Sequence, residues 1–356
     1  MAETHCYIIG KSGTGKSTFL LNDILNNQNG FCLLDPHGDL AETVADNVDC
    51  IYFDPPDISL GFNVLENVPK AQRHLVAANI VSSFKAIWGE SWGPRLEWIL
   101  YNCLRVLLDN NQYLLDIPTV LTDKTYRARL LPKASFSNFW EQEFDRWDDR
   151  FRNDAIAPVL NKVGQLVADP TLHKLFSGKT TLKPSRIIAK RQRLVVNLSK
   201  GKLGDAPSHL LGALLVSAFY QAAQTGDRTP FTLYVDEFQN FATDTFATIL
   251  SEARKYHLQI FLSHQYLGQL PDHLRQAVFG NVSTVTCFRV GAEDAPIIAA
   301  ELGLGNPTIL TDLPPYKAYS RVGGPYNAEY FDTPPPPEPK GRLQASRNHT
   351  KACYVC

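Results

Sequence analysis

The chain has 356 residues, of which 44% are hydrophobic and 20% are charged, so it can bury a large core and is neither disordered nor fibrous. Its net charge of -1 excludes a generally basic surface, so any contacts with nucleic acid must be local. The seven cysteines are scattered, most of them in apolar runs, which favours reduced thiols over a disulfide framework.

Residues 1–69 have the rhythm of an α/β protein with a parallel sheet. Short apolar strands are predicted at THCYIIG (4–10), GFCLLDP (30–36) and CIYFDP (50–55), and a helix follows the first of them. Residues 70–178 instead carry apolar residues at helical spacing and few strand signals. We therefore expect an all-α domain inserted into the sheet domain.

Strand signals return after the insertion. Further strands are predicted at RLVVNLSKG (193–201), FTLYVDEF (231–238), LQIFLSHQ (258–265) and STVTCFRVG (283–291), and helices at 208–224, 243–257 and 293–303. From residue 313 onward the chain is rich in proline, which favours an extended C-terminal tail over 313–356. The sheet domain thus has two parts, 1–69 and 179–312.

A phosphate-binding loop is the clearest motif. GKSGTGKST, residues 10–18, fits the P-loop pattern and lies between a predicted strand and a helix. Glycines let backbone N–H groups converge on phosphate oxygens, and the helix N-terminus adds partial positive charge. Lys16 is expected to reach the β- and γ-phosphates of ATP, and Ser17 to ligate Mg²⁺. The predicted nucleotide-binding residues are Gly10, Ser12, Gly13, Thr14, Gly15, Lys16, Ser17 and Thr18.

An acidic pair follows the predicted strand FTLYV. The carboxyl end of a buried parallel strand lies beside a P-loop, so Asp236 is expected to hold Mg²⁺ through water. Glu237 is the candidate base that orients and deprotonates the attacking water. A carboxylate in this position favours hydrolysis over transfer to a small acceptor.

Three further residues have two readings each. The turn DPHG at 35–38 is either structural or lines the site, with His37 touching nucleotide. Gln265 ends a strand on the phosphate edge, where it either binds the attacking water or the γ-phosphate or is an ordinary solvent-facing residue. Arg254 is either a cation that stabilises a helix end or an arginine finger that completes the site of a neighbouring subunit.

The motifs in their order resemble the TraG/TraD-like conjugative coupling ATPases of type IV secretion, in the HerA–FtsK superfamily. The resemblance rests on the P-loop, DPHGD, GFNVL, VNLSKGKLG, YVDEFQNF, EARK and SHQ around a helical insertion. It implies a RecA-like P-loop NTPase fold and a six-membered ring that pumps DNA through a central channel. It also implies that Arg254 acts in trans and that Gln265 senses the γ-phosphate. Arg289 is a second candidate near a subunit edge, or an ordinary strand-end cation.

Coupling proteins usually carry an N-terminal membrane anchor, and no such segment precedes the first predicted strand here. We therefore expect a cytoplasmic protein at the inner face of the membrane, attached through a missing anchor or a separate membrane partner. The expected partners are DNA, five further copies in a homo-hexamer, and a relaxase or secretion-channel proteins. Some basic residues either contact DNA or form an ordinary solvated charged surface: Lys179, Lys183, Arg186, Lys190, Arg191 and Arg193.

The leading hypothesis is an ATP-hydrolysing DNA translocase coupled to a type IV secretion or conjugation channel. Two alternatives stay open: a secretion or pilus-assembly ATPase that acts on protein, and a nucleotide-dependent scaffold. The rate of ATP hydrolysis with and without DNA separates all three.

Overall fold

A nine-stranded sheet is the centre of the computed structural model, which describes residues 4–58, 60–323 and 328–354. The strand order is β3-β4-β2-β5-β6-β1-β7-β8-β9. The pairs from β3 to β7 are parallel, and β7–β8 and β8–β9 are antiparallel. The predicted α/β architecture with a mostly parallel central sheet is confirmed.

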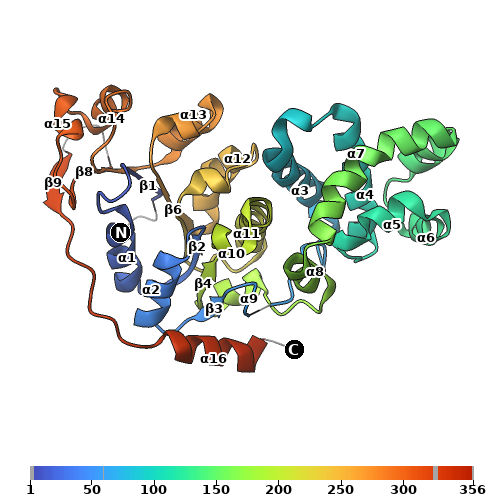
Figure 1. Ribbon diagram of the computed structural model, residues 1–356, viewed down its shortest axis with the longest axis horizontal. Coiled ribbons are helices and arrows are strands. Elements are labelled where there is room, and N and C mark those ends of the chain that lie inside the picture. Colours follow the sequence, from blue (N-terminus) through green and yellow to red (C-terminus); the bar gives the residue numbers. More distant parts are fainter. Residues whose placement is uncertain (1–3, 59, 324–327, 355–356) are drawn as a thin grey trace.

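The parallel strands are short apolar runs covered on both faces. They are β1 (Cys6–Ile9), β2 (Gly30–Asp35), β3 (Ile51–Phe53), β4 (Arg193–Asn197), β5 (Phe231–Val235), β6 (Leu258–His264) and β7 (Thr284–Cys287). All residues of β1, β2, β3 and β5 are buried, as expected when helices pack on both sides of a parallel sheet. Helices α1 (Lys16–Asn26) and α2 (Asp39–Asn47) lie on one face (Figure 1). The other face carries α11 (Asp205–Thr225), α12 (Phe246–Glu252) and α13 (Asp272–Asn281).

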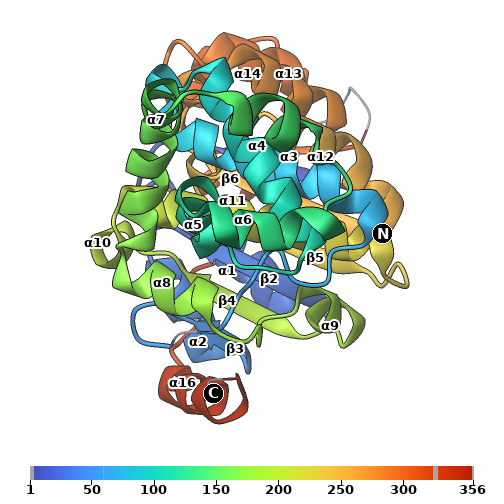
Figure 2. The ribbon, with the colours of Figure 1, turned by 90° about the vertical axis from the view of Figure 1, so that its right-hand side faces the viewer.

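A separate group of helices occupies the chain between β3 and β4. Its main helices are α3 (Arg73–Trp88), α4 (Pro94–Asp109), α5 (Ile117–Thr122), α6 (Lys124–Leu130), α7 (Asp149–Val167) and α8 (Pro170–Ser177), after which α9 (Pro184–Ala189) returns to the sheet. Figure 1 shows these helices as a second lobe beside the sheet domain, and in Figure 2 they lie in front of it. Helix α3 of this lobe packs on α11 of the sheet domain. The division into domains at residues 70 and 178 stays a prediction.

Aromatic residues form the core of the helical lobe. Phe139, Trp140 and Phe144 are fully buried, with ring centroids 4.9–5.8 Å apart. The Arg127 guanidinium lies 4.8 Å from the centre of the Phe144 ring and donates hydrogen bonds to Val120 O at 2.8 Å and to Asp145 at 2.9 Å. These contacts give the lobe a core of its own.

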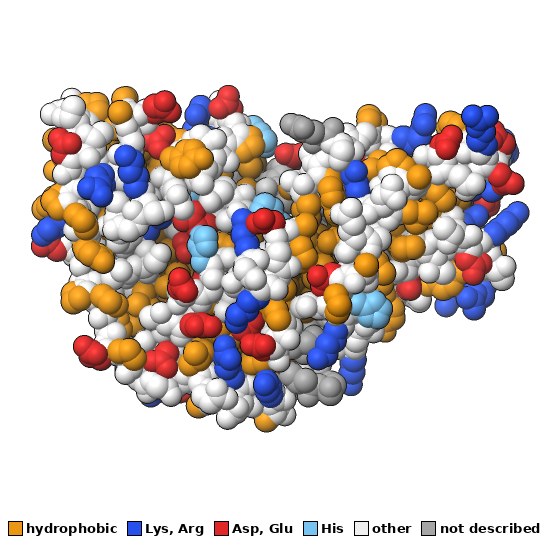
Figure 3. Space-filling view, viewed as in Figure 1, with side chains coloured by type: hydrophobic (Ala, Val, Ile, Leu, Met, Phe, Trp, Pro, Cys, Tyr) orange, Lys and Arg blue, Asp and Glu red, His pale blue; other side chains and the backbone are white. Residues whose placement is uncertain are grey.

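A groove of about 740 Å³ lies where the helical lobe meets the sheet domain. Val81, Trp92 and Trp98 line part of it, and an ion pair of 3.3 Å between Lys85 and Asp244 joins the two sides. Figure 3 shows apolar side chains gathered on the face where the two parts meet. Among the helices of residues 4–354 that the structure describes, none is long and apolar enough to cross a bilayer.

The C-terminal region has more regular structure than its proline content predicts. After α14 (Ala295–Leu302) and α15 (Thr308–Thr311), residues predicted as an extended tail form β8 (Lys317–Val322), β9 (Glu329–Asp332) and α16 (Leu343–Tyr354). An extended segment over 333–342 does run between β9 and α16, around the outside of α1 and α2 (Figure 1). Helix α16 forms because it docks on α2 and β3, where Thr350 Oγ1 accepts the Tyr52 N–H at 2.8 Å.

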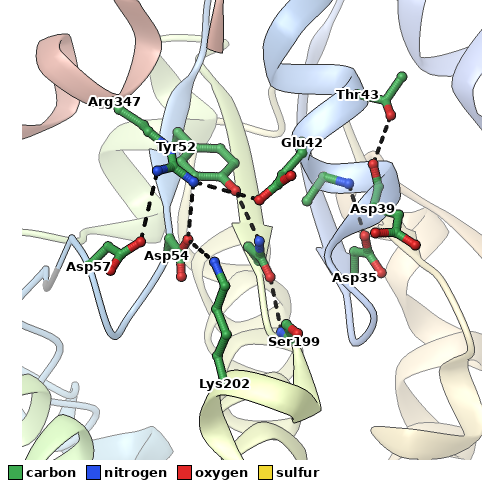
Figure 4. Close-up of polar contacts among 12 residues, drawn as sticks. Asp35, Asp39, Glu42, Thr43, Tyr52, Asp54, Asp57, Ser199, Lys202 and Arg347 are labelled. Atoms are coloured by element: carbon green, nitrogen blue, oxygen red, sulfur yellow. Dashed lines mark hydrogen bonds and ion pairs between the residues drawn. The ribbon is translucent and has the colours of Figure 1, made fainter. Parts of the chain in front are cut away.

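A polar cluster fastens α16 to the sheet (Figure 4). The Arg347 guanidinium lies 3.6 Å from the buried carboxylate of Asp54, which also accepts a hydrogen bond of 3.0 Å from Lys202 Nζ. Asn197 Nδ2 donates to the Tyr52 hydroxyl at 3.0 Å. Asn197 and Lys202 both belong to the VNLSKGKLG segment, which therefore holds Tyr52 of β3 and Asp54 just after it.

Candidate active site

The P-loop follows β1 and leads into α1. Gly10 packs so tightly that a Cβ there would lie 2.6 Å from Phe288 Cβ. Gly15 precedes the helix with φ of 116°, a backbone conformation that favours glycine. The loop therefore wraps closely around the first turn of α1, with backbone N–H groups and the positive end of the helix dipole available to an anion.

The Lys16 ammonium lies inside this loop. Its Nζ donates hydrogen bonds to Gly10 O at 2.6 Å and to Lys11 O at 3.3 Å. Burial lowers the pKa of Lys16, and the charges of Glu237 and Asp236 oppose that effect. A buried ammonium held by carbonyl oxygens alone is ready to exchange them for phosphate oxygens, which are stronger partners.

Asp236 lies beneath the loop at the carboxyl end of β5. Its side chain is buried, and its carboxylate accepts a short hydrogen bond from Ser263 Oγ. Burial raises the pKa of Asp236 to about 7, and the nearby charge of Asp35 adds to the effect. An acidic group this destabilised in its charged form is suited to bind a cation.

Glu237 and Gln265 meet across two neighbouring strands. Gln265 Nε2 donates to Glu237 Oε1 at 3.1 Å, and Gln239 Nε2 donates to Glu237 Oε2 at 2.7 Å. Glu237 has φ of 46°, in the left-handed region that non-glycine residues rarely adopt. Such strain concentrates at functional sites, and here it turns the carboxylate toward the P-loop pocket that Glu237 lines.

His37 reaches the same pocket from the neighbouring strand β2. The DPHG turn is held by Asp35, whose carboxylate accepts the N–H groups of His37 at 2.8 Å and Ala41 at 2.9 Å. Asp35 thus serves the turn, whereas the exposed His37 side chain lines the pocket. The DPHG segment is therefore both a structural turn and part of the pocket wall, and contact of His37 with a nucleotide stays a prediction.

The pocket at the P-loop has a volume of about 250 Å³. Most of the predicted residues line it, whereas Gly10, Thr14 and Asp236 are buried and do not. The lining residues are Ser12, Gly13, Gly15, Lys16, Ser17, Thr18, His37, Glu237, Gln265 and Tyr316.

Arg254 lies far from this pocket. It belongs to the 3₁₀ turn Ala253–Tyr256 that precedes β6, whereas Gln265 follows the same strand. Seven residues of extended strand separate the two, so the Arg254 and Gln265 backbones lie more than about 20 Å apart. Arg254 is exposed and cannot reach its own P-loop. A role in catalysis therefore requires a neighbouring subunit, and the helix-end reading remains the alternative.

Arg289 follows β7 and lies beside the chain's own P-loop. Its carbonyl accepts the Lys11 N–H at 2.8 Å, and its side chain is half-buried. This position makes Arg289 a neighbour of the loop through its backbone.

Three residues of the site were not predicted. Ser263 bonds Asp236, and its position could have been inferred because β5 and β6 pair in parallel with Val235 opposite Leu262. Gln239 supports Glu237 from within the YVDEFQNF segment. Tyr316 belongs to no motif and comes from the C-terminal region.

Comparisons with known proteins agree with this geometry. Residues 230–309 match the family model described as the TraM recognition site of TraD and TraG. This segment contains Asp236, Glu237, Arg254 and Gln265, and the match confirms the resemblance to TraG/TraD-like coupling ATPases over these residues. A search of the curated proteins finds no match.

Solved structures share the fold over nearly the whole chain. The plasmid coupling protein TrwB in complex with ADP and Mg²⁺ is 16% identical, with a TM-score of 0.73 over 96% of this chain and 87% of that one. TrwB in complex with the GTP analogue GDPNP gives 16% and 0.72 over 96% and 88%. VirB4 of Thermoanaerobacter pseudethanolicus gives 13% and 0.69 over 92% and 88%. These likenesses confirm the predicted fold, that of the TrwB coupling protein.

Proposed function

We propose that this chain is an ATP-hydrolysing motor that moves DNA toward a type IV secretion or conjugation channel as a hexameric ring. The observation that carries the proposal is the P-loop pocket, in which Lys16, Glu237 and Gln265 converge at the carboxyl edge of the sheet. The family-model match over residues 230–309 and the fold shared with the coupling protein TrwB support the conjugative role.

The residues present fit ATP and Mg²⁺. The loop offers N–H groups and the Lys16 ammonium to the phosphates, and the buried Asp236 carboxylate lacks a cationic partner at hydrogen-bond distance among the described residues. Ser17 and Asp236 would hold Mg²⁺, which when bound neutralises charge that builds on the phosphates. The other residues of the P-loop and His37 would surround the nucleotide.

Hydrolysis then follows from positions around Glu237. Its carboxylate would take a proton from a water molecule that attacks the γ-phosphate, and Lys16 would stabilise the negative charge on the phosphate oxygens. Gln265 Nε2 donates a hydrogen bond to Glu237 and would turn to the γ-phosphate when ATP is bound. Arg254 would supply a further positive charge to the site of the adjacent subunit.

The proposed DNA contacts lie at the other end of the strands. Lys183 and Arg186 are exposed around α9, and Lys190 and Arg191 are exposed just before β4. Phosphate contacts of this kind strengthen binding at low salt without reading sequence. Attachment to the membrane would come from a segment or partner outside the described residues.

The deciding experiment measures ATP hydrolysis against protein concentration, without DNA and with single- or double-stranded DNA. A cooperative rise with concentration and stimulation by DNA are expected. Lys16→Ala should abolish turnover, whereas Lys11→Ala, which removes an exposed lysine of the same loop, should keep it. A rate of ATP hydrolysis that DNA does not change would favour an ATPase that moves protein. Tight ATP binding without hydrolysis would favour a scaffold.

A further inference from the structure

Besides the imidazole of His37, Tyr316 is the one aromatic side chain among those that line the P-loop pocket. Its N–H donates to Thr14 O at 2.7 Å, and its carbonyl accepts the Thr333 N–H at 2.8 Å. The ring lies against the loop, because a Cβ added to Gly15 would be 3.1 Å from Tyr316 Cδ1. Tyr316 is therefore built into the phosphate-binding loop from the C-terminal region.

The strand order places Tyr316 on a definite side of the P-loop. Glu237 follows β5 and Gln265 follows β6, both on one flank of β1. Tyr316 directly precedes β8, on the other flank, beyond β7. Because β8 is antiparallel to β7, its first residues meet the carboxyl edge of the parallel strands. The P-loop pocket is therefore lined from both flanks, by Glu237 and Gln265 on one side and by Tyr316 on the other.

Tyr316 combines a strained backbone with a side chain that is only half-buried. Its φ is 63°, a conformation that costs free energy for a residue with a Cβ, and 48% of the residue is exposed. Burial of the ring therefore does not explain why the strain is tolerated. Phe288 and Phe331 pack on Phe19 of α1 at 6.1 Å and 5.7 Å between ring centroids, and they already supply the apolar support of this region.

We propose that Tyr316 is the platform on which the nucleotide base stacks. This inference rests on the proposed function, because it assumes that ATP occupies the P-loop pocket. The γ-phosphate must lie toward Glu237 and Gln265, so the nucleoside leaves the pocket on the opposite flank, where Tyr316 stands. Stacking uses the face of the ring and not its hydroxyl, so Phe at this position supports the base equally well.

The test compares ATP with inorganic tripolyphosphate, which has the phosphates but no base. Dissociation constants are measured by calorimetry with Mg²⁺ for the full chain and for Y316N, Y316F and Y330N. Asparagine tolerates the left-handed backbone that Tyr316 adopts, so Y316N removes the ring with little added strain. Tyr330 is the matched control, because it is a tyrosine on the same hairpin, 51% exposed, that does not line the pocket.

We expect Y316N to bind ATP about 5- to 30-fold more weakly than the unchanged chain, with tripolyphosphate binding unchanged. Y316F and Y330N should bind both ligands as the unchanged chain does. The inference is overturned if Y316N binds ATP normally, or if it loses ATP and tripolyphosphate by the same factor, since Tyr316 would then only shape the loop. If the unchanged chain binds no ATP, the proposed function itself fails, and the inference fails with it.

Discussion

Replacing Asp236 with asparagine should stabilise the protein while it abolishes the proposed ATP hydrolysis. The carboxylate is 4% exposed and lies near Asp35, and together these raise its pKa from 3.8 to about 7. A raised pKa in an acid means that its charged form opposes folding, with no cost below pH 3.8 and the full cost above pH 7. That cost is about 4 kcal/mol once the group is ionised.

Asparagine has the same shape, still accepts the Ser263 hydrogen bond and never ionises. The free energy of unfolding of Asp236→Asn minus that of the unchanged chain should therefore grow by about 2.5 kcal/mol between about pH 5 and about pH 8. Urea unfolding followed by circular dichroism at several pH values measures this difference. Mg²⁺ and ATP should reduce this difference, because they stabilise the unchanged chain more than Asp236→Asn, which lacks the carboxylate proposed to hold Mg²⁺.

Asp154→Asn, at an exposed position on α7, is the matched control and should show no such trend. A difference between Asp236→Asn and the unchanged chain that stays constant from about pH 5 to about pH 8 would refute the reasoning, because Asp236 would then ionise as it does in water.

The remaining predictions concern catalysis, assembly and the helical lobe. Glu237→Gln should keep ATP binding and lower the rate of hydrolysis by about 10²–10⁴-fold, and an unchanged rate would remove Glu237 as the base. Arg254→Ala and Lys16→Ala subunits, each inactive alone, should recover ATP hydrolysis when they are mixed, because a Lys16→Ala subunit can supply Arg254 to the intact P-loop of an Arg254→Ala neighbour. No recovery in rings shown to exchange subunits would contradict action in trans. Arg127→Leu should lower the free energy of unfolding by about 2–4 kcal/mol in urea titrations, since it leaves Val120 O and Asp145 without their donor. Arg129→Leu, at an exposed position on the same helix, should change it little.

The P-loop pocket could largely be predicted because its signals are local. The loop at 10–18 encodes its own backbone shape, and the carboxyl ends of parallel strands must share one edge, which brings Glu237 and Gln265 to the loop. The same logic places Arg254 at the opposite edge. Ser263 was missed only because the register of β5 and β6 was not used.

Other features depend on contacts between distant parts of the chain. Backbone hydrogen bonds to Thr14 and Thr333 hold Tyr316 at the pocket, and no sequence pattern predicts these contacts. Helix α12 ends at Glu252, earlier than predicted, and a 3₁₀ turn follows up to His257, whose φ of 58° ends the helical course. Helix α16 is short and polar, so its stability comes from docking and not from its own sequence.

The docked helix α16 also covers an edge strand of the sheet. Strand β3 is the outermost strand at its end of the sheet, and such a strand offers free N–H and C=O groups to strands of other chains. Thr350 occupies the Tyr52 N–H, and Arg347 holds the helix over that strand. A chain cut before residue 343 would therefore expose a template for strand addition. The C-terminal helix therefore covers an edge strand that would otherwise be open to pairing with strands of other chains.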